Sequence, residues 1–220
     1  MFILQTIKLG EEFRTVSLRE FDEMPSPRLI KSHAPTQLLL GMNGENLELE
    51  LGLKIIVISR NPLDSCVSRY YHAFNPFKIG WPFPAWAAVW LTGNSSYGSW
   101  FDWVRGWSEQ AKKNVDQILW IQYEDMIRNP ENEIRKIQLF LNISSADNKF
   151  IDNVKRGCSF DSMKKQSMAK ESSGDFQGHL RKGIIGDWKN HFTEDMKKEF
   201  LDTYNKELVG SGLIYDFGEN

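Results

Sequence analysis

The chain alternates short apolar runs with longer stretches in which apolar residues recur at helical spacing. The run Lys54–Ser59 (KIIVIS) is continuous and β-branched, as in strands that are buried on both faces of a parallel sheet. Ile118–Tyr123 (ILWIQY) is a second run of this kind, and Arg28–His33 is a third candidate strand. Strands that alternate with helices predict an α/β fold built on a parallel sheet.

Helices are predicted after the first two of these runs. Pro62 directly follows Asn61 and suits the first turn of a helix, so Leu63–Ala73 is predicted to be helical. In Glu131–Leu141 the apolar residues fall at positions 134, 137, 140 and 141, which is helical spacing. The polar stretch Met168–Gln177 contains Ser-Ser-Gly and predicts a mobile loop.

Polar residues stand at the end of each predicted strand. The three clusters are Lys31-Ser32-His33, Ser59-Arg60-Asn61 and Tyr123-Glu124-Asp125. In open parallel sheets, ligands bind outside the carboxyl ends of the strands. The pattern therefore predicts a binding site where these clusters meet.

Arg60 has two interpretations. The helix predicted after it offers free backbone N–H groups, its guanidinium suits a phosphate, and Ser68 can add a hydroxyl. The alternative is a structural ion pair between Arg60 and Asp64 or Asp125, since such pairs are common in proteins.

His33 also has two interpretations. A neutral imidazole at a strand end can take a proton from a substrate hydroxyl, and Lys31 can stabilise charge on a transferred group. The alternative is that His33 is a solvated or capping residue, the commoner role of a lone histidine in such a turn.

Arg181 and Lys182 stand directly before Gly183 in the glycine-containing segment GHLRKGIIGDWKN. This segment is either a solvated loop or an anion clamp, and its own residues do not decide between the two. An aromatic set around several prolines is predicted to be mostly core, with a pocket wall as the alternative. Its members are Tyr70, Tyr71, Phe74, Phe77, Trp81, Phe83, Trp86 and Trp90.

Composition narrows the classes of function. The 220 residues are 41% apolar and carry 27 Lys plus Arg against 29 Asp plus Glu, a net charge of −2. This balance argues against a nucleic-acid binder, and no window approaches the ~18–20 apolar residues of a membrane span. Because the N-terminus has no signal-peptide pattern, we expect a cytoplasmic protein with neither nucleic-acid nor membrane partners.

The two cysteines, Cys66 and Cys158, are too few for a disulfide framework. We expect both to be buried thiols of a reducing compartment. Neither has a histidine within metal-ligand spacing, so no metal site is predicted.

A series of ordered motifs from about Arg28 to Phe217 resembles the cytosolic sulfotransferase family. The motifs are RLIKSH, KIIVISRNPLDSCVSRYYHAF, YGSWFDWVRGW, YEDM, CSFDSMKK and RKGIIGDWKN. The resemblance implies one domain over residues 1–220 with the kinase-like fold of that family. It also implies transfer of a sulfonyl group from 3′-phosphoadenosine-5′-phosphosulfate (PAPS) to the hydroxyl of a small, largely apolar phenol or alcohol, without a metal.

The resemblance assigns a role to each motif. It makes His33 the general base and Lys31 the neighbouring cation. The residues that it places on the 3′-phosphate are Arg60, Ser68, Arg181, Lys182 and Gly183, and those on the adenosine are Tyr123, Cys158, Ser159, Phe160 and Met163. Like phosphoryl transfer, the chemistry needs in-line placement and charge stabilisation.

Two features depart from the family. Its members begin with a strand and a loop of the form Pro-Lys-Ser-Gly-Thr-Thr-Trp, which holds the 5′-phosphosulfate. The 30 residues before His33 contain one glycine, Gly10, followed by the anion-repelling Glu11 and Glu12. We therefore expect an N-terminally truncated domain that lacks its first strand and exposes strand edges. The alternative to an active transferase is an impaired isoform or fragment that binds nucleotide weakly or serves in interactions.

The second departure concerns assembly. Lys189 and Thr193 fit a Lys-x-x-x-Thr-Val-x-x-x-Glu dimer segment of the family, but Glu194 and Lys198 replace its Val and Glu. We therefore expect a monomer or a weak homodimer.

Overall fold

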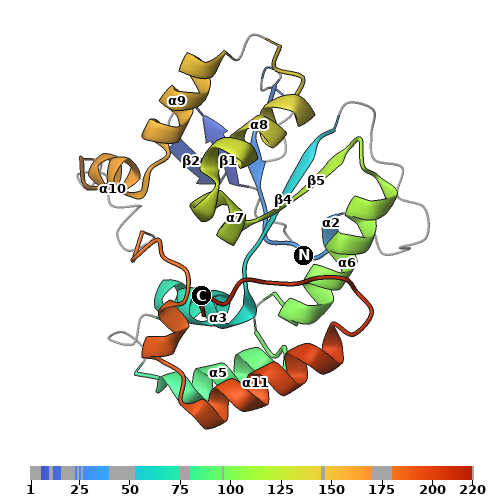
Figure 1. The fold of residues 1–220 in the computed structure, drawn as a ribbon, viewed down its shortest axis with the longest axis vertical. Helices are drawn as coiled ribbons and strands as arrows, with labels where there is room; N and C mark the ends of the chain where they lie inside the picture. Colours follow the sequence, from blue (N-terminus) through green and yellow to red (C-terminus); the bar gives the residue numbers. More distant parts are fainter. Residues whose placement is uncertain are drawn as a thin grey trace.

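Two parallel strands lie at the centre of the computed structural model (Figure 1), which describes residues 6–9, 12–15, 23, 25, 27–39, 53–74, 80–95, 97–144, 147–169 and 180–219. Strand β4 (Ile55–Ser59) pairs with β5 (Ile118–Gln122), with Val57 opposite Trp120. Both strands agree with the prediction to within one residue at each end. The predicted α/β fold with a parallel sheet is therefore confirmed.

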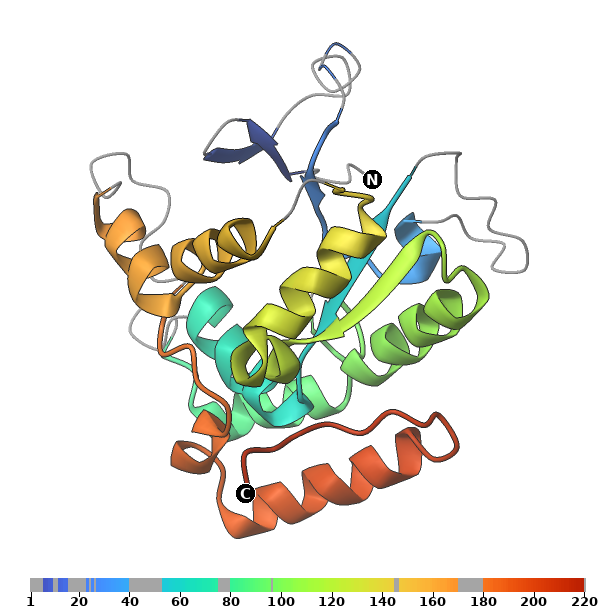
Figure 2. The ribbon, with the colours of Figure 1, turned by 45° about the horizontal axis from the view of Figure 1, so that its top comes forward.

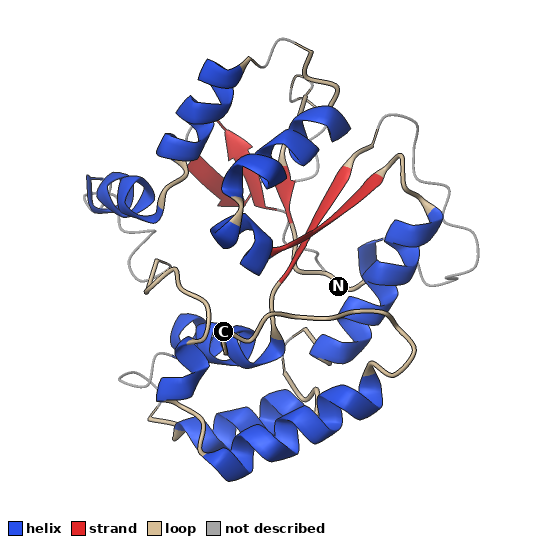
Figure 3. Cartoon of the chain, viewed as in Figure 1, coloured by secondary structure: helices blue, strands red, loops and turns tan. Residues whose placement is uncertain are grey.

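A second, antiparallel sheet has the strand order β2-β1-β3 and is drawn in red with the parallel pair in Figure 3. Its strands are β1 (Thr6–Leu9), β2 (Glu12–Thr15) and β3 (Ile30–Lys31). The strand expected over Arg28–His33 is thus short and pairs antiparallel to β1. Leu29 and Ile30 are 58% and 36% exposed, so this segment lacks the burial on both faces that a central parallel strand has.

Helices surround the parallel pair, as Figures 1 and 2 show from two directions. They are α2 (Thr36–Leu39), α3 (Pro62–Arg69), α5 (Phe83–Leu91), α6 (Trp100–Lys113), α7 (Tyr123–Arg128), α8 (Pro130–Phe140), α9 (Asn148–Gly157), α10 (Phe160–Ala169) and α11 (Glu194–Glu207). A π-helical turn (Tyr70–Phe74) extends α3, and a 3₁₀ turn (Asp187–Asn190) precedes α11. Helix α6 packs beside β5, and α5 runs alongside α11.

Local sequence explains where the two predicted helices begin. The side chain of Asn61 accepts a hydrogen bond from the backbone N–H of Asp64, and Pro62 occupies the first turn of α3. Pro130 plays the same part in α8, which lies within one residue of its predicted range. The mobile loop predicted over Met168–Gln177 cannot be assessed beyond Ala169, where α10 ends, because the rest lies outside the described residues.

The main core packs α3 against the C-terminal helices. Leu63 and Val67 of α3, together with Trp86 of α5, pack in one cluster with Trp188 and Phe200. Of the aromatic set, Tyr70 and Trp86 are buried, whereas Tyr71, Phe83 and Trp90 pack against this cluster from its edge. Trp81 is 43% exposed, Phe77 lies outside the described residues, and nothing is described of the Phe74 side chain. The prediction that most of the set is core is confirmed for the five that pack there.

The last residues of the chain cross the carboxyl ends of β4 and β5 as a strap, drawn in dark red in Figure 1 and defined here as residues 213–219. Gln122 donates to the carbonyl O of Ile214 at 2.9 Å, and Trp188 Nε1 donates to the carbonyl O of Phe217 at 2.8 Å. The strap therefore closes the sheet edge at which the polar clusters were predicted to meet. Among the described residues, no helix combines the length and apolar character that crossing a membrane requires.

Candidate functional site

The His33 segment connects β3 to α2. Lys31 lies in β3, and the His33 ring centroid lies 5.2 Å from that of Tyr97. The guanidinium of Arg69 also lies over the Tyr97 ring, 4.8 Å from its centroid. Desolvation by the surrounding protein, followed by the positive charges of Lys31, Arg69 and His72, lowers the pKa of His33 to about 4. His33 is therefore a neutral imidazole at physiological pH, although part of its surface is exposed.

Arg60 links two distant parts of the chain. Its Nη2 donates to the carbonyl O of Ile184 at 2.8 Å, and its guanidinium lies 4.3 Å from the ring centroid of Tyr123. The same nitrogen is 3.4 Å from the carboxylate of Asp64, so the ion pair considered from the sequence does form. Nevertheless, the buried Nε of Arg60 has no hydrogen-bond partner among the described residues. A buried guanidinium N–H without a partner favours an anion as an additional ligand.

Asp64 joins the start of α3 to the segment around Gly186. Its two carboxylate oxygens accept hydrogen bonds from the backbone N–H of Gly186 at 2.8 Å and of Trp188 at 3.0 Å. Asn61 Nδ2 also donates to this carboxylate, at 3.0 Å. Asp64 is only 1% exposed, so it acts as a buried acceptor for three donors. These hydrogen bonds therefore join the turn that contains Arg60 to the segment that carries Arg181 and Lys182.

Glu124 anchors the same turn to the end of β5. Its Oε1 accepts from the backbone N–H of Asn61 at 2.8 Å and from Asn61 Nδ2 at 2.9 Å. Burial raises the pKa of Glu124, whereas the hydrogen bonds from Asn61 act in the opposite direction. The predicted meeting of the second and third polar clusters is thus present in the structure as a direct contact.

The RKG segment (residues 181–183) is held against the protein by ion pairs, although Lys182 itself is exposed. Arg181 Nη1 lies 2.5 Å and Lys182 Nζ 2.6 Å from the carboxylate of Asp187, whose side chain is 1% exposed. The Arg181 guanidinium also rests 4.8 Å from the ring centroid of Tyr71. Burial opposes the charge of Asp187, but hydrogen bonds from Lys182, Asn190 and Arg181 outweigh it and lower its pKa to about 2. Asp187 therefore orients both cations at one place.

Replacing Asp187 with asparagine is expected to lower the free energy of unfolding by about 1–2 kcal/mol at neutral pH, allowing for solvent screening. The folded-state pKa of about 2 lies below the ordinary value of 3.8, so folding favours the ionised carboxylate. The stabilisation is complete above about pH 4 and is lost as the pH falls through 2. Urea unfolding of both proteins between pH 6 and 2 should show their difference shrinking below pH 4.

The Asp202→Asn variant serves as the control, because the Asp202 pair with Lys198 is exposed on α11. It should change stability little at any pH. A difference for Asp187→Asn that grows below pH 4 would contradict the pairing with Arg181 and Lys182.

Phe160 and Gly183 meet across the site. Gly183 has a φ of +67°, and a Cβ at this position would lie 2.3 Å from the Phe160 ring. No side chain fits there, so the glycine allows the RKG segment to pass directly over the aromatic ring. The structure therefore brings two of the residues predicted for the nucleotide into contact.

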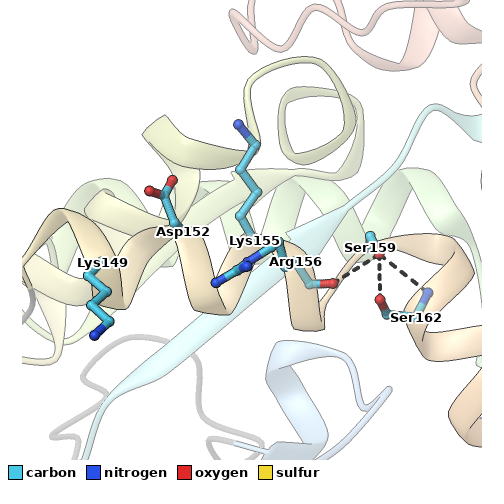
Figure 4. A pocket seen from close by; sticks show the side chains of 6 residues that line it. All are labelled: Lys149, Asp152, Lys155, Arg156, Ser159 and Ser162. Atoms are coloured by element: carbon cyan, nitrogen blue, oxygen red, sulfur yellow. Dashed lines mark hydrogen bonds between the residues drawn. The ribbon is translucent and has the colours of Figure 1, made fainter.

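The other residues of the predicted adenosine segment lie at the end of α9 and the start of α10. Ser159 donates to the carbonyl O of Arg156 and lies 2.9 Å from the hydroxyl of Ser162, as Figure 4 shows. Met163 is 37% exposed. The side chains drawn in Figure 4 line a hollow near this segment, and three of them are cations. The lining residues are Lys149, Asp152, Lys155, Arg156, Ser159 and Ser162.

The expectation that both cysteines are buried is wrong for one of them. Cys66 is buried in the core, where desolvation raises its pKa, whereas Cys158 is exposed. Cys158 caps the C-terminus of α9, at the point where the chain leaves one helix and starts the next.

The predicted site residues fall into two groups. Arg60, Tyr123, Gly183 and Phe160 form a connected set through the contacts above, while Ser68 is exposed on α3. His33 and Lys31 lie on the β3 side, where Arg69 of α3 lies over Tyr97 and its charge acts on His33. In the described part of the chain, no cluster of His, Cys, Asp and Glu could hold a metal ion.

Sequence reasoning missed the carboxylates that hold these residues. Asp187 and Glu124 were not assigned roles, and Asp64 was considered only as a partner of Arg60. The signal available was weak: an Asn-Pro-x-Asp start to a helix predicts the cap, but not that Asp64 bonds to Gly186 and Trp188.

Comparison with known proteins shows the family. A family model described as "Sulfotransferase domain" matches residues 6–212. Sulfotransferase 1C2 of Homo sapiens is 35% identical over 203 residues, which cover 87% of this chain and 65% of the relative. Sulfotransferase 1B1 of Mus musculus is 36% identical over 206 residues, covering 87% and 64%. The chain thus spans about 65% of the length of these relatives.

Solved structures agree with this result. A mouse sulfotransferase, SULT7A1, complexed with PAP is similar with a TM-score of 0.74 and 29% identity, covering 88% of this chain and 69% of that one. Retinol dehydratase in a complex with retinol and PAP has a TM-score of 0.75 at 22% identity, covering 90% and 58%, and supports the fold alone. The resemblance found in the sequence is confirmed, and the chain belongs to the sulfotransferase family.

Proposed function

We propose that this chain forms the nucleotide-binding body of a sulfotransferase that moves a sulfonyl group from PAPS to a hydroxyl of a small, largely apolar phenol or alcohol. The observation that carries the proposal is the position of Arg60, which contacts Ile184 and Tyr123 and keeps a buried N–H without a described partner. The similar SULT7A1 structure is described as complexed with PAP, the desulfonated product, 3′-phosphoadenosine-5′-phosphate.

The 3′-phosphate would bind between Arg60 and the RKG segment. Arg60 offers a planar fork, and Arg181 and Lys182 add two cations that Asp187 holds in place. The Ser68 hydroxyl on α3 completes the proposed set. The base would pack near Phe160, where Gly183 allows the backbone to approach the ring, with Tyr123, Cys158, Ser159 and Met163 as the remaining contacts.

The transfer step would use His33 and Lys31. The acceptor oxygen attacks sulfur, a new O–S bond forms, the S–O bond to the 5′-phosphate breaks, and the hydroxyl proton passes to His33. The lowered pKa of His33, about 4, keeps the imidazole neutral and able to accept a proton at physiological pH. Lys31 would stabilise charge on the leaving oxygens. Tyr97, 46% exposed beside His33, offers an aromatic surface to an apolar acceptor.

A specific observation favours the alternative of an impaired nucleotide binder. Among the described residues, β4 pairs only with β5, and Ile58 of β4 is 50% exposed. A half-exposed isoleucine on a strand paired on one side fits the hypothesis that residues 1–220 form a truncated domain without its first strand and phosphosulfate loop. On that hypothesis the chain binds nucleotide through Arg60 but transfers the sulfonyl group weakly.

Other features bear on the location of the protein in the cell and on its oligomeric state. Two cysteines without a disulfide support a cytoplasmic location. Lys189 donates to the carbonyl O of Gly218, and Lys198 pairs with Asp202 in the same chain. These internal contacts use two residues of the family's dimer segment, which supports a monomer or a weak homodimer. No nucleic acid, membrane or metal enters the proposal.

Calorimetric titration with PAP tests the nucleotide site. The unaltered chain is expected to bind PAP with a submicromolar Kd, and Arg60→Ala to weaken binding by about 10- to 100-fold, the equivalent of one charge-assisted interaction. Arg135→Ala is the matched control, because Arg135 pairs with Glu131 on the exposed surface of α8. Equal affinity of the Arg60→Ala and unaltered proteins, or no binding at all, would reject the proposed site.

A further inference from the structure

One backbone carbonyl next to His33 accepts two indole hydrogen bonds. Trp103 Nε1 and Trp107 Nε1 both donate to the carbonyl O of Ala34, each at 3.2 Å. The two tryptophans lie one turn apart on α6, and their ring centroids are 6.3 Å apart. A carbonyl oxygen has two lone pairs, so both are used. The contacts join segments that are 69 and 73 residues apart in the chain.

Between the two tryptophans, Gly106 allows the same segment to lie against α6. A Cβ at Gly106 would be 2.7 Å from Oγ1 of Thr36, which is the first residue of α2 and only 7% exposed. Residues 103, 106 and 107 share one helical face. These three residues and the surface that they form on α6 are called the dock below.

The other hydrogen bonds described for residues 34–36 join them only to neighbours in the chain. Pro35 has no backbone N–H, and the N–H of Ala34 is engaged by the nearby Ser32 hydroxyl at 3.1 Å. Strand β3 before it is two residues long and exposed. The carbonyl held by the two indoles belongs to the residue directly after His33. The dock therefore anchors the backbone that carries His33.

We infer that Trp103, Gly106 and Trp107 are positioning residues that hold the imidazole of His33 against Tyr97. The assignment of His33 as the base rests on the proposed function, whereas the docking of its segment does not. Four groups face the ring: Lys31 of β3, Arg69 of α3, His72 of the π-helical turn, and Tyr97. Releasing the segment separates His33 from the last three and exposes the ring to water.

The test is an NMR titration of the His33 imidazole in the full chain, with the resonance assigned by a His33→Gln variant. His33 should titrate near pH 4 in the unaltered protein. In Trp107→Phe and Trp103→Phe, which keep an aromatic ring but lose the N–H, its pKa should rise by about one unit toward the ordinary value, because the ring regains water. Gly106→Ala should act in the same direction by displacing Thr36, although alanine favours the helix itself.

Trp120→Phe is the matched control. The Nε1–H of Trp120 is buried and has no partner among the described residues, so its removal breaks no described hydrogen bond. The His33 pKa should stay unchanged in this variant. An unchanged His33 pKa in folded Trp107→Phe, Trp103→Phe and Gly106→Ala would overturn the inference.

A kinetic readout separates the dock from general folding. In any form of the protein that transfers sulfonyl groups, Trp107→Phe should lower kcat about tenfold through misplacement of the base, with the Kd for PAP unchanged. A Kd for PAP that rises in parallel would indicate a structural role and count against positioning. If the chain does not bind PAP, the proposed function fails, while the titration still decides whether the dock holds His33.

Discussion

Replacing Asp64 with alanine is expected to lower the free energy of unfolding by about 3–5 kcal/mol, since each buried donor left without a partner costs about 1–3 kcal/mol. The donors are Asn61 Nδ2 and the backbone N–H groups of Gly186 and Trp188. Trp188 is 3% exposed in the main core, so the damage is not confined to a loop. Urea unfolding of the variant should show a lower midpoint at a similar slope.

Asparagine at position 64 should be almost as damaging as alanine. Both oxygens of Asp64 accept hydrogen bonds: Oδ1 from the Trp188 N–H, and Oδ2 from Asn61 Nδ2 and the Gly186 N–H. An amide would turn one acceptor into a donor that faces another donor. The control is Asp202→Ala, where loss of the exposed pair with Lys198 should change stability little. A loss below 1 kcal/mol for Asp64→Asn would show that the carboxylate is not the acceptor of all three bonds.

The sequence predicted the elements whose signals are local. The apolar runs around Val57 and Ile121 became β4 and β5, and Asn61-Pro62 became the start of α3. The polar clusters at the ends of these strands meet, since parallel strands end at one edge of a sheet and Glu124 bonds to Asn61. The family was also predictable, because its motifs occur in order along most of the chain.

Contacts between distant segments could not be predicted in the same way. Asp64 and Gly186 are 122 residues apart, and Ala34 and Trp107 are 73 residues apart. A polar residue at one end of such a pair resembles any other polar residue until the partner is placed beside it. The same reasoning applies to Asp187, a buried carboxylate that pairs with both cations of the RKG segment.

The Cys158 prediction failed, and the strand expected over Arg28–His33 is limited to Ile30–Lys31, for a related reason. Leu29 and Ile30 form an apolar pair, but both are exposed in the described structure. Cys158 follows an amphipathic helix, but it caps that helix and is exposed. Burial depends on tertiary packing, and a local pattern gives only a tendency.

On the truncation hypothesis, the largest effect is expected from supplying the phosphosulfate loop. A chimera that carries the family's first strand and its Pro-Lys-Ser-Gly-Thr-Thr-Trp loop ahead of the His33 segment should transfer sulfonyl groups from PAPS to a simple phenol at least 10²- to 10³-fold faster than the 220-residue chain. One oxyanion donor contributes about 2.7–4 kcal/mol to such a transition state, and the loop would add a lysine as well as backbone N–H groups. The added strand should also cover Ile58, which is 50% exposed on β4.

The control for this chimera carries alanine in place of the grafted lysine. Its sheet should be completed equally, as judged by its resistance to urea, but it should lose most of the gained rate. PAP affinity should remain dependent on Arg60 in all three proteins, because the 3′-phosphate site proposed at Arg60 is at the opposite end of the nucleotide from the grafted loop. Equal turnover by the unaltered chain and the chimera would contradict the truncation hypothesis. The 5′-phosphosulfate would then have to bind to residues other than those of the family loop. A chimera that is stabilised and binds PAP but gains no rate would instead count against His33 and Lys31 as the reacting pair, because the loop and the nucleotide would then be in place without chemistry.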